Sequence, residues 1–321
     1  MSGKLKMENN QKKPIVSVIM NCLNCAEYLG EALDSVFSQT YKNWEIILWD
    51  NASMDNSAEI AKSYGERVKY FRSDKTYPLG RARNLAIEKA TGRYVAFLDC
   101  DDIWLPEKLE KQISALSSDS EVGLVFSDAI YFNKKSKSFQ LYGKNKPPEG
   151  YVFGSLLKKW FLCLSTVVIK KETLSGLNEW FDARFNYIED TDLFLRIAYD
   201  WKIAYVDDVL AKYRMHEESW TYKYYLFFPE EKEILVKKLL NLYPNLSKEY
   251  SCELKAMQAH INYEKFVLYW KKNERKRARQ YLRPFIMSDK KLLLAYIFSY
   301  FFSFPFFMFL LRAYREKTYS P

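Results

Sequence analysis

A predicted buried strand runs directly into a cluster of carboxylates near residue 100. The strand is Arg93–Leu98, and Asp99-Cys100-Asp101-Asp102 follows it at once. Carboxylates are costly to bury without partners, and in open α/β sheets ligands bind at the carboxyl ends of the strands. A divalent cation such as Mg²⁺ or Mn²⁺, which prefers oxygen ligands and bridges phosphates, makes this crowding favourable. A solvated acidic turn that starts a helix is the alternative.

The segment before this cluster alternates strands with helices. We expect strands at Ile15–Met20, Trp44–Trp49, Val68–Phe71 and Arg93–Leu98. The expected helices between them are Ala26–Ser38, Asn56–Tyr64 and Leu79–Ala90. Alternation at this spacing is typical of right-handed crossovers between parallel strands. We therefore predict an α/β fold with a mostly parallel sheet.

The pattern changes after the acidic cluster. Further elements are expected as a helix at Pro106–Leu116, strands at Val122–Phe132 and Ser165–Ile169, a polar loop or hairpin at Lys134–Pro148, a helix at Asp190–Tyr199, and short strands at Ile203–Val206 and Val209–Arg214. From about residue 225 onward, the predicted structure is entirely helical and increasingly basic. Residues 1–13 are polar, lack the apolar core of a signal peptide, and are expected to be disordered.

Charge and cysteine usage limit the partners and the compartment. The net charge of +9 favours an anionic partner, which is a nucleic acid, a membrane surface or a phosphorylated substrate. No familiar nucleic-acid module is visible, so we expect no nucleic-acid partner. Five scattered cysteines indicate a reducing compartment rather than a disulfide framework. Cys22 and Cys25 form a single C-x-x-C without a second pair, and we interpret them as incidental thiols rather than as a zinc or redox site.

The C-terminal region combines a basic stretch with an apolar one. Seven of the residues between Lys271 and Arg283 are basic, and Leu292–Leu311 contains no charged residue. As one helix, the apolar stretch would be about 30 Å long, enough to cross a bilayer core. Basic clusters attract anionic lipid headgroups. We interpret the tail as an anchor lying in one leaflet; a full span and a buried helical hairpin or dimer interface are the alternatives.

Four further polar positions are candidates for chemistry. Asp50 ends the second predicted strand, and Arg83 lies near a helix start, which favours phosphate. Asp190, at the start of an apolar helix pattern, is a candidate general base. His216 follows the last predicted strand and is a candidate metal ligand. Each has a structural alternative: a turn cap, an exposed arginine, a helix cap or a structural histidine.

In this order and spacing, the motifs resemble those of family 2 glycosyltransferases with the GT-A fold. The matching segments are Pro14–Met20, Tyr28–Val36, Asp50–Ser57, the D-x-D element Asp99-Cys100-Asp101, the E-D element Glu189-Asp190 and the Y-R-x-H element Tyr213–His216, within about residues 14–220. Two segments depart from the family pattern. The usual Pro-x-Tyr-Asn stands here as Asn21-Cys22-Leu23-Asn24, and the usual Asp-Asp-Gly-Ser as Asp50-Asn51-Ala52-Ser53.

The resemblance implies an inverting transfer from a nucleotide-sugar, with a UDP-sugar favoured, to a lipid-linked or polysaccharide acceptor. The implied roles are nucleobase or ribose contact for Asp50, phosphate contact for Arg83, ribose proximity for Asp99, Mg²⁺ or Mn²⁺ ligation for Asp101 and His216, and the general base for Asp190. It also implies a Rossmann-like sheet with helices on both faces. A catalytically inactive scaffold that binds nucleotide or membrane is the alternative.

These expectations give a domain plan and a location. We expect a disordered N-terminus (1–13), a catalytic domain (14–222), a basic helical region (223–289) and an apolar membrane-associating tail (290–321). The basic and apolar regions together place the protein at the cytoplasmic face of the membrane, and a homo-oligomer is compatible with the sequence.

Overall fold

The computed structural model describes residues 15–134, 138–217, 219, 224–287 and 290–307. The chain divides into two compact units. Unit 1 comprises residues 1–153 and 161–219, and unit 2 comprises residues 154–160 and 220–321. The predicted disordered segment 1–13 lies outside the described residues, and the predicted boundaries at 222 and 289 stay predictions.

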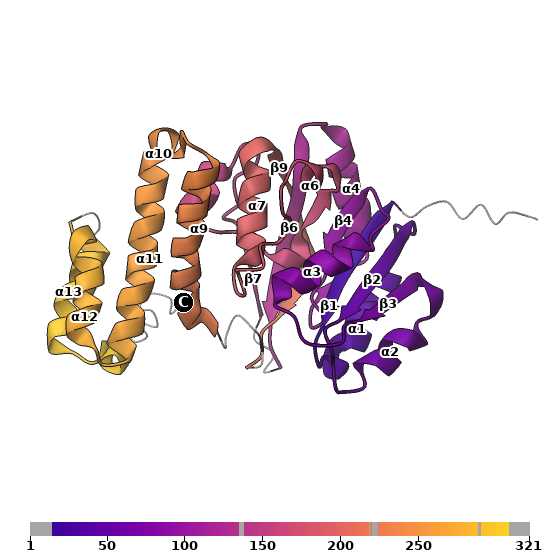
Figure 1. The fold of residues 1–321 in the computed structure, drawn as a ribbon, viewed down its shortest axis with the longest axis horizontal. Helices are drawn as coiled ribbons and strands as arrows, with labels where there is room; N and C mark the ends of the chain where they lie inside the picture. Colours follow the sequence, from indigo (N-terminus) through magenta and orange to yellow (C-terminus); the bar gives the residue numbers. More distant parts are fainter. Residues whose placement is uncertain (1–14, 135–137, 218, 220–223, 288–289, 308–321) are drawn as a thin grey trace, which may run out of the picture. The chain divides into compact units, whose positions relative to one another are not determined.

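Unit 1 is built on one sheet of nine strands, whose strands are drawn as arrows among the helices in Figure 1. The strands are β1 (Val16–Cys22), β2 (Trp44–Asp50), β3 (Val68–Arg72), β4 (Tyr94–Phe97), β5 (Ile103–Trp104), β6 (Val122–Phe132), β7 (Ser138–Gln140), β8 (Val168–Lys170) and β9 (Lys202–Arg214). The order across the sheet is β3-β2-β1-β4-β8-β6-β9-β5, with β7 paired to β6. The helices of this unit are α1 (Ala26–Phe37), α2 (Ser57–Ser63), α3 (Leu79–Glu88), α4 (Lys108–Ser118), α6 (Glu172–Ser175) and α7 (Glu189–Asp200).

The first four strands form the expected parallel part of the sheet. β1 pairs in parallel with both β2 and β4, and β2 pairs in parallel with β3. Each connection carries a helix, as the alternating pattern predicts. The carboxyl ends of β1, β2 and β4 therefore meet at one edge of the sheet.

Beyond β4 the sheet is mixed. β8 runs antiparallel to both β4 and β6, so β6 and its parallel partner β9 have the same direction as β4. The two short strands predicted at 203–214 are one strand, β9. Ser127 of β6 pairs with Val206 and Asp128 pairs with Val209, so the pairing continues across a register shift and the strand is not interrupted. The end of β9 consequently lies at the same edge as the ends of β1, β2 and β4.

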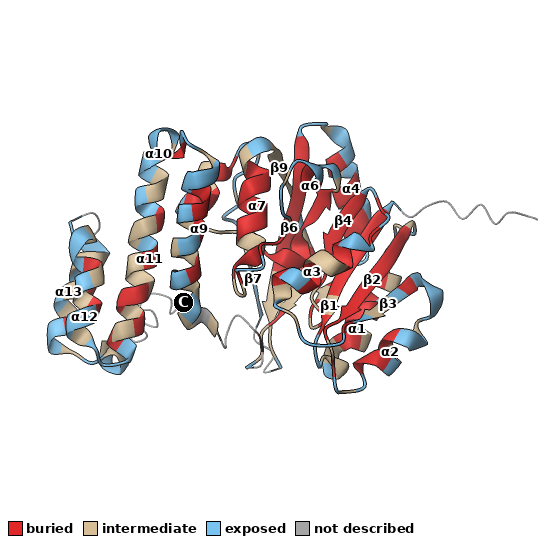
Figure 2. Cartoon of the chain, viewed as in Figure 1, coloured by how far each residue is buried: buried red, intermediate tan, exposed pale blue. Residues whose placement is uncertain are grey.

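Helices pack on both faces of this sheet, as expected. Val16, Val18 and Met20 of β1 share one apolar cluster with Leu29 and Leu33 of α1. On the alternate face, α3 packs against β1 and β2. Because both faces are covered, the central strands are buried almost throughout, as Figure 2 shows for β1, β2 and β4.

Unit 2 is helical, as predicted. Its main helices are α9 (Phe228–Leu242), α10 (Leu246–Glu249), α11 (Ser251–Lys271), α12 (Arg275–Leu282) and α13 (Lys290–Phe301), preceded in the chain by the short α5 (Phe153–Lys158). A cluster centred on Phe266 and Trp270 of α11 joins α11, α12 and α13. Ala278, Leu282 and Ala295 are buried in this cluster.

The apolar tail does not continue as one long helix through the described residues. α13 ends at Phe301, and a short new turn begins after Ser303, with Pro305 in its first turn. Proline lacks the N–H that a helix interior needs, which explains the interruption. Among residues 15–307 as described, no helix is both long enough and apolar enough to cross a membrane. Residues 308–311 of the predicted apolar stretch lie outside the described part of the chain.

Candidate active site

His216 and Asp101 meet at the edge of the sheet where the strands end. His216 Nε2 lies 2.9 Å from Asp101 Oδ2, and the two side chains are 15% and 27% exposed. The ring of Tyr28, from α1, lies 5.1 Å from the imidazole ring. The two residues predicted as metal ligands are thus brought together and remain open to solvent on one side.

Arg214 fixes the end of β9 to the acidic turn and so places His216. Its backbone N–H donates to Asp102 Oδ1 at 2.9 Å, and its Nε donates to the Asp101 carbonyl at 2.8 Å. Its guanidinium also pairs with Glu31 and stacks over the Tyr28 ring. Asp102 itself is buried and accepts a 2.5 Å hydrogen bond from the Ser165 hydroxyl. Burial, together with the neighbouring Asp101 and Asp99, raises the pKa of Asp102 well above its usual range.

Arg83 joins the acidic turn to the start of α7. It is 4% exposed, and its guanidinium pairs with Glu189 on one side and with Asp99 Oδ1, at 3.2 Å, on the other. Burial raises the pKa of Glu189 to about 7, against the opposing charge of Arg83. The predicted phosphate contact for Arg83 stays a prediction; in this structure its observed partners are the two carboxylates.

The segment before α7 is held against α3 by a reciprocal pair of hydrogen bonds. Asn84 Nδ2 donates to the Phe181 carbonyl at 2.7 Å, and the Phe181 N–H donates back to Asn84 Oδ1 at 2.9 Å. A Cβ added at Gly80 would lie 3.4 Å from Glu189 Cβ, so glycine allows a close approach of the two helix starts. This packing brings the E-D element to Arg83.

Asp190 is half-buried in the first turn of α7. Its Oδ1 accepts hydrogen bonds from the Thr191 N–H at 2.7 Å and from the Thr191 hydroxyl at 3.3 Å. Burial raises the pKa of Asp190, while Arg83 and these hydrogen bonds oppose the shift. The charge of Asp190 in turn helps to raise the pKa of Asp99, so the two carboxylates share one electrostatic environment. Asp99 is partly exposed, at 36% of its side chain.

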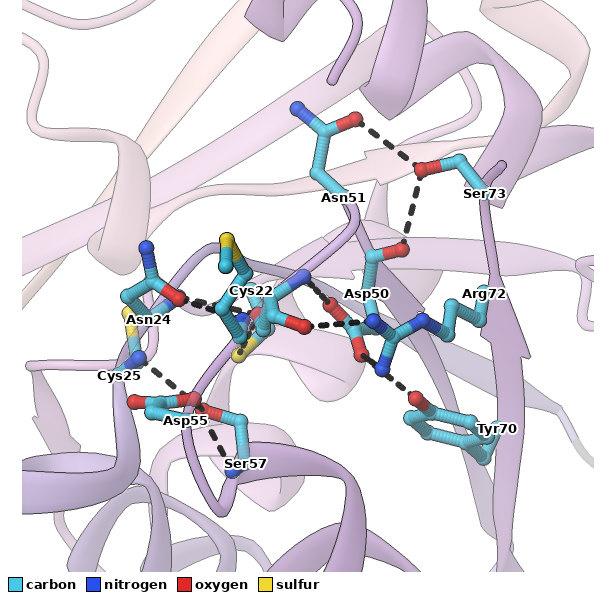
Figure 3. A network of polar contacts seen from close by, with 12 residues as sticks. Cys22, Asn24, Cys25, Asp50, Asn51, Asp55, Ser57, Tyr70, Arg72 and Ser73 are labelled. Carbon is cyan, nitrogen blue, oxygen red and sulfur yellow. Dashed lines mark hydrogen bonds and ion pairs between the residues drawn. The ribbon is translucent and has the colours of Figure 1, made fainter. Parts of the chain in front are cut away.

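Asp50 is completely buried at the end of β2, in the network drawn in Figure 3. Oδ1 accepts the Ser53 N–H at 2.7 Å, and Oδ2 accepts the Tyr70 hydroxyl at 2.5 Å with Arg72 Nη1 at 3.5 Å. The Arg72 side chain is 47% exposed. The predicted nucleobase or ribose contact of Asp50 stays a prediction, and the observed network holds the following turn and orients Arg72.

Glu189, Arg214 and Asp102 lie in motifs that the sequence singled out, but sequence reasoning gave none of them an individual role. One signal was available: Arg83 shares a face of its helix with Ala86 and Ile87, which are buried. A charged residue on the apolar face of a helix requires a buried partner, and Glu189 is that partner. The pattern of α3 therefore indicated that Arg83 has a buried carboxylate partner, but it did not indicate which carboxylate.

Comparisons with known proteins identify the family of the chain. A sequence profile described as glycosyl transferase family 2 matches residues 17–171. Over 208 residues the chain is 31% identical to the Escherichia coli UDP-Glc:alpha-D-GlcNAc-diphosphoundecaprenol beta-1,3-glucosyltransferase WfgD, covering 64% of this chain and 79% of the relative.

Solved structures share the fold as well, among them the following two. One is S. aureus TarS 1–349 in complex with UDP-GlcNAc, with a TM-score of 0.64 and 18% identity over 86% of this chain and 82% of the other. The second is the mannosyltransferase PcManGT from Pyrobaculum calidifontis in complex with GDP-Man and Mn²⁺, with a TM-score of 0.58 and 16% identity over 96% of this chain and 88% of the other. The chain belongs to glycosyl transferase family 2, has the GT-A-like α/β fold and is a glycosyltransferase.

Proposed function

We propose that this glycosyltransferase moves a sugar from a UDP-sugar to a hydroxyl group of a lipid-linked acceptor, with inversion at the anomeric carbon. The observation that carries the proposal is the convergence of the Asp101–His216 pair with the Asp99–Arg83–Glu189 chain of contacts. Two similar proteins support the donor: WfgD is named for its use of UDP-Glc, and TarS is bound to UDP-GlcNAc in a solved structure. The WfgD name also supports a diphosphoundecaprenol-linked acceptor.

Asp190 is proposed as the general base. A base for a sugar hydroxyl must reach the proton that it takes, and its pKa must be suited to the working pH. Asp190 is half-buried and has a raised pKa. It lies close enough to Asp99 for its charge to raise the pKa of Asp99 as well. Thr191 occupies only Oδ1 in the described contacts, which leaves Oδ2 for the acceptor hydroxyl.

Asp101 and His216 fit a divalent cation. Their ligand atoms lie 2.9 Å apart, are partly open to solvent and are held in place by Arg214. Asp101 and His216 would hold the cation, and a small set of protein ligands is common for Mg²⁺ and Mn²⁺. When bound, the cation neutralises negative charge on the leaving diphosphate. The Mn²⁺ in the PcManGT complex supports this assignment.

The remaining side chains orient these groups. Arg83 holds Asp99 and Glu189 in fixed positions. Its positive charge offsets part of the negative charge of these two carboxylates. Arg72, which donates to the buried Asp50 and to the Ser53 carbonyl, is proposed as a further nucleotide contact. Holding donor and acceptor in line is itself a large part of catalysis, because it removes the entropic cost of their encounter.

Membrane association is proposed from the surface of unit 2. α13 exposes Leu294, Ile297, Tyr300 and Phe301, while Lys276, Arg277 and Arg283 are exposed in the neighbouring basic segment. Basic residues near a membrane contribute about 1 kcal/mol each towards binding anionic lipid. Such a surface suits an enzyme whose acceptor is carried by a lipid, at the cytoplasmic face of the membrane.

Transfer by the purified protein is the direct test. With Mn²⁺ or Mg²⁺, a panel of UDP-sugars and an undecaprenyl-diphosphate-linked sugar as acceptor, we expect a product of inverted anomeric configuration. Asp190→Asn should lower kcat by about 10²–10⁴-fold. Asp200→Asn, the same change at the exposed end of the same helix, is the matched control and should retain activity. Full activity of Asp190→Asn would remove Asp190 from the role of base.

A catalytically inactive scaffold is the competing function. It predicts binding of UDP or membrane without turnover of any donor in the panel. Calorimetry of UDP binding shows whether UDP is the nucleotide that the protein binds, independently of turnover. Metal-dependent UDP binding without transfer would favour the scaffold, and transfer by the wild-type protein would exclude it.

A further inference from the structure

Three thiols lie close together at the acidic turn. Cys22 ends β1, Cys25 immediately precedes α1, and Cys100 lies between Asp99 and Asp101. Their sulfur atoms all lie within 4.8 Å of one another. Cys22 and Cys100 are buried, whereas Cys25 is half-buried. The C-x-x-C seen in the sequence is therefore part of a three-sulfur cluster, whose third member comes from another strand end.

The fold accounts for this meeting. β1 and β4 are parallel neighbours, so the residues that follow them are adjacent at the sheet edge. The Cys100 thiol donates to the Asn21 carbonyl at 3.2 Å. The turn between Cys22 and Cys25 contains Asn24 in the left-handed region, at a φ of 54°, which folds the chain back on itself.

Two serines hold this turn in position, as Figure 3 shows in part. The Cys25 N–H donates to Ser57 Oγ at 3.0 Å, and the Asn24 N–H donates to Ser53 Oγ at 2.9 Å. These bonds fix the backbone of the turn that carries Cys22 and Cys25, and the three sulfur atoms lie close together beside it. The cluster is thus a built arrangement, and Cys25 is its one partly exposed member.

We propose that Cys22, Cys25 and Cys100 form a binding site for a thiophilic metal ion, Zn²⁺. Zinc bonds to thiolate sulfur at about 2.3 Å, which sets tetrahedral sulfur ligands roughly 3.8 Å apart. The observed separations therefore need only a small closure. A metal uses all three sulfur atoms, whereas a disulfide would use two and leave a buried thiol beside it. A water molecule would supply the fourth ligand, and Cys25 is the partly exposed member of the three.

This site differs in chemistry from the Asp101–His216 pair. Soft thiolates select Zn²⁺, whereas carboxylates suit Mg²⁺ and Mn²⁺. Because Cys100 is covalently between Asp99 and Asp101, an ion held by the three sulfur atoms fixes the backbone of the donor-binding turn to β1 and α1. The inference goes beyond the proposed transfer reaction and does not depend on it.

Metal binding to the full-length, reduced and chelator-stripped protein tests the proposal. Titration with Co²⁺ in excess Mg²⁺, which occupies hard-ligand sites, should give a thiolate-to-cobalt charge-transfer band that saturates at one equivalent. Zn²⁺ should displace the Co²⁺ and abolish the band. Cys252→Ser, which alters an exposed cysteine of unit 2, is the matched control and should behave as the wild type.

Two variants remove one ligand each. Cys25→Ser changes a half-buried position, and Cys100→Val keeps a buried position apolar. Each should weaken Zn²⁺ binding by more than about 10-fold, because even residues that only support ligands are worth about 10–100-fold. Circular dichroism establishes that each variant is folded. The absence of a charge-transfer band in the reduced wild-type protein would overturn the proposal, as would unchanged Zn²⁺ affinity in both folded variants.

Discussion

His216 Nε2 lies 2.9 Å from Asp101 Oδ2, although 115 residues separate them in the chain. Arg214 produces this contact by donating to the carbonyl of Asp101 and to the side chain of Asp102. The end of β9 is thereby attached to the turn after β4. Donor binding is expected to depend on this attachment, since it assembles the pair that we assign to the cation.

Removing the imidazole should weaken cation use. His216→Ala is expected to raise the Mn²⁺ concentration needed for half-maximal activity by about 10-fold or more, since metal affinity falls at least this far when supporting groups are lost. The measurement is initial transfer rate against free Mn²⁺. His260→Ala is the control, because this second histidine lies on α11 with 61% of its side chain exposed. Equal Mn²⁺ curves for both variants would contradict the assignment.

The pH dependence of kcat should report the raised pKa of Asp190. A general base must be ionised, so kcat should increase with pH through this pKa and then level off. Because burial raises the pKa of Asp190, the acidic limb should lie above the value of about 3.9 for a free aspartate. Thr191→Val removes the hydroxyl that donates to Asp190 and should move the limb further towards high pH. A limb that stays at the free-aspartate value in both proteins would argue against Asp190.

Ala52 should limit the stability of unit 1. Its φ of 67° lies in the left-handed region, where a side chain costs about 1–2 kcal/mol and where the related family pattern has glycine. Ala52→Gly is expected to increase the free energy of unfolding by about 0.5–1 kcal/mol, after subtraction of the extra entropy of glycine in the unfolded chain. Urea denaturation measures this change. Ala58→Gly, in the helix α2, is the opposite control and should destabilise.

Binding to anionic vesicles should depend on the basic segment of unit 2. Lys276→Gln combined with Arg283→Gln removes two exposed charges and should weaken binding by about 2 kcal/mol, roughly 30-fold. Co-sedimentation with vesicles containing phosphatidylserine measures the affinity. The control removes two exposed lysines of unit 1, Lys62→Gln and Lys144→Gln. Similar losses for both pairs would indicate a general charge effect instead of a docking surface.

The sequence predicted the parallel half of the fold well, because local patterns specify it. Each of the first four strands and the helices between them was recognised from apolar periodicity, which depends only on near neighbours in the chain. The continuous β9 was missed, because its interruption at Asp207-Asp208 resembles a turn. Only the irregular pairing with β6 makes this segment continuous.

The order of acidic, basic and histidine motifs along the chain was enough by itself to indicate the family; the catalytic and binding roles that these motifs imply stay predictions. The sequence could not state which of these residues touch, because a contact between distant positions depends on strand order, direction and register. The parallel pairing of β1 with β4 gathers the thiols of Cys22, Cys25 and Cys100. The packing of α3 against α7 buries Arg83 with Glu189. Tertiary structure alone decided these partners. Whether a buried charge or thiol is stabilised depends on the groups that the fold places beside it.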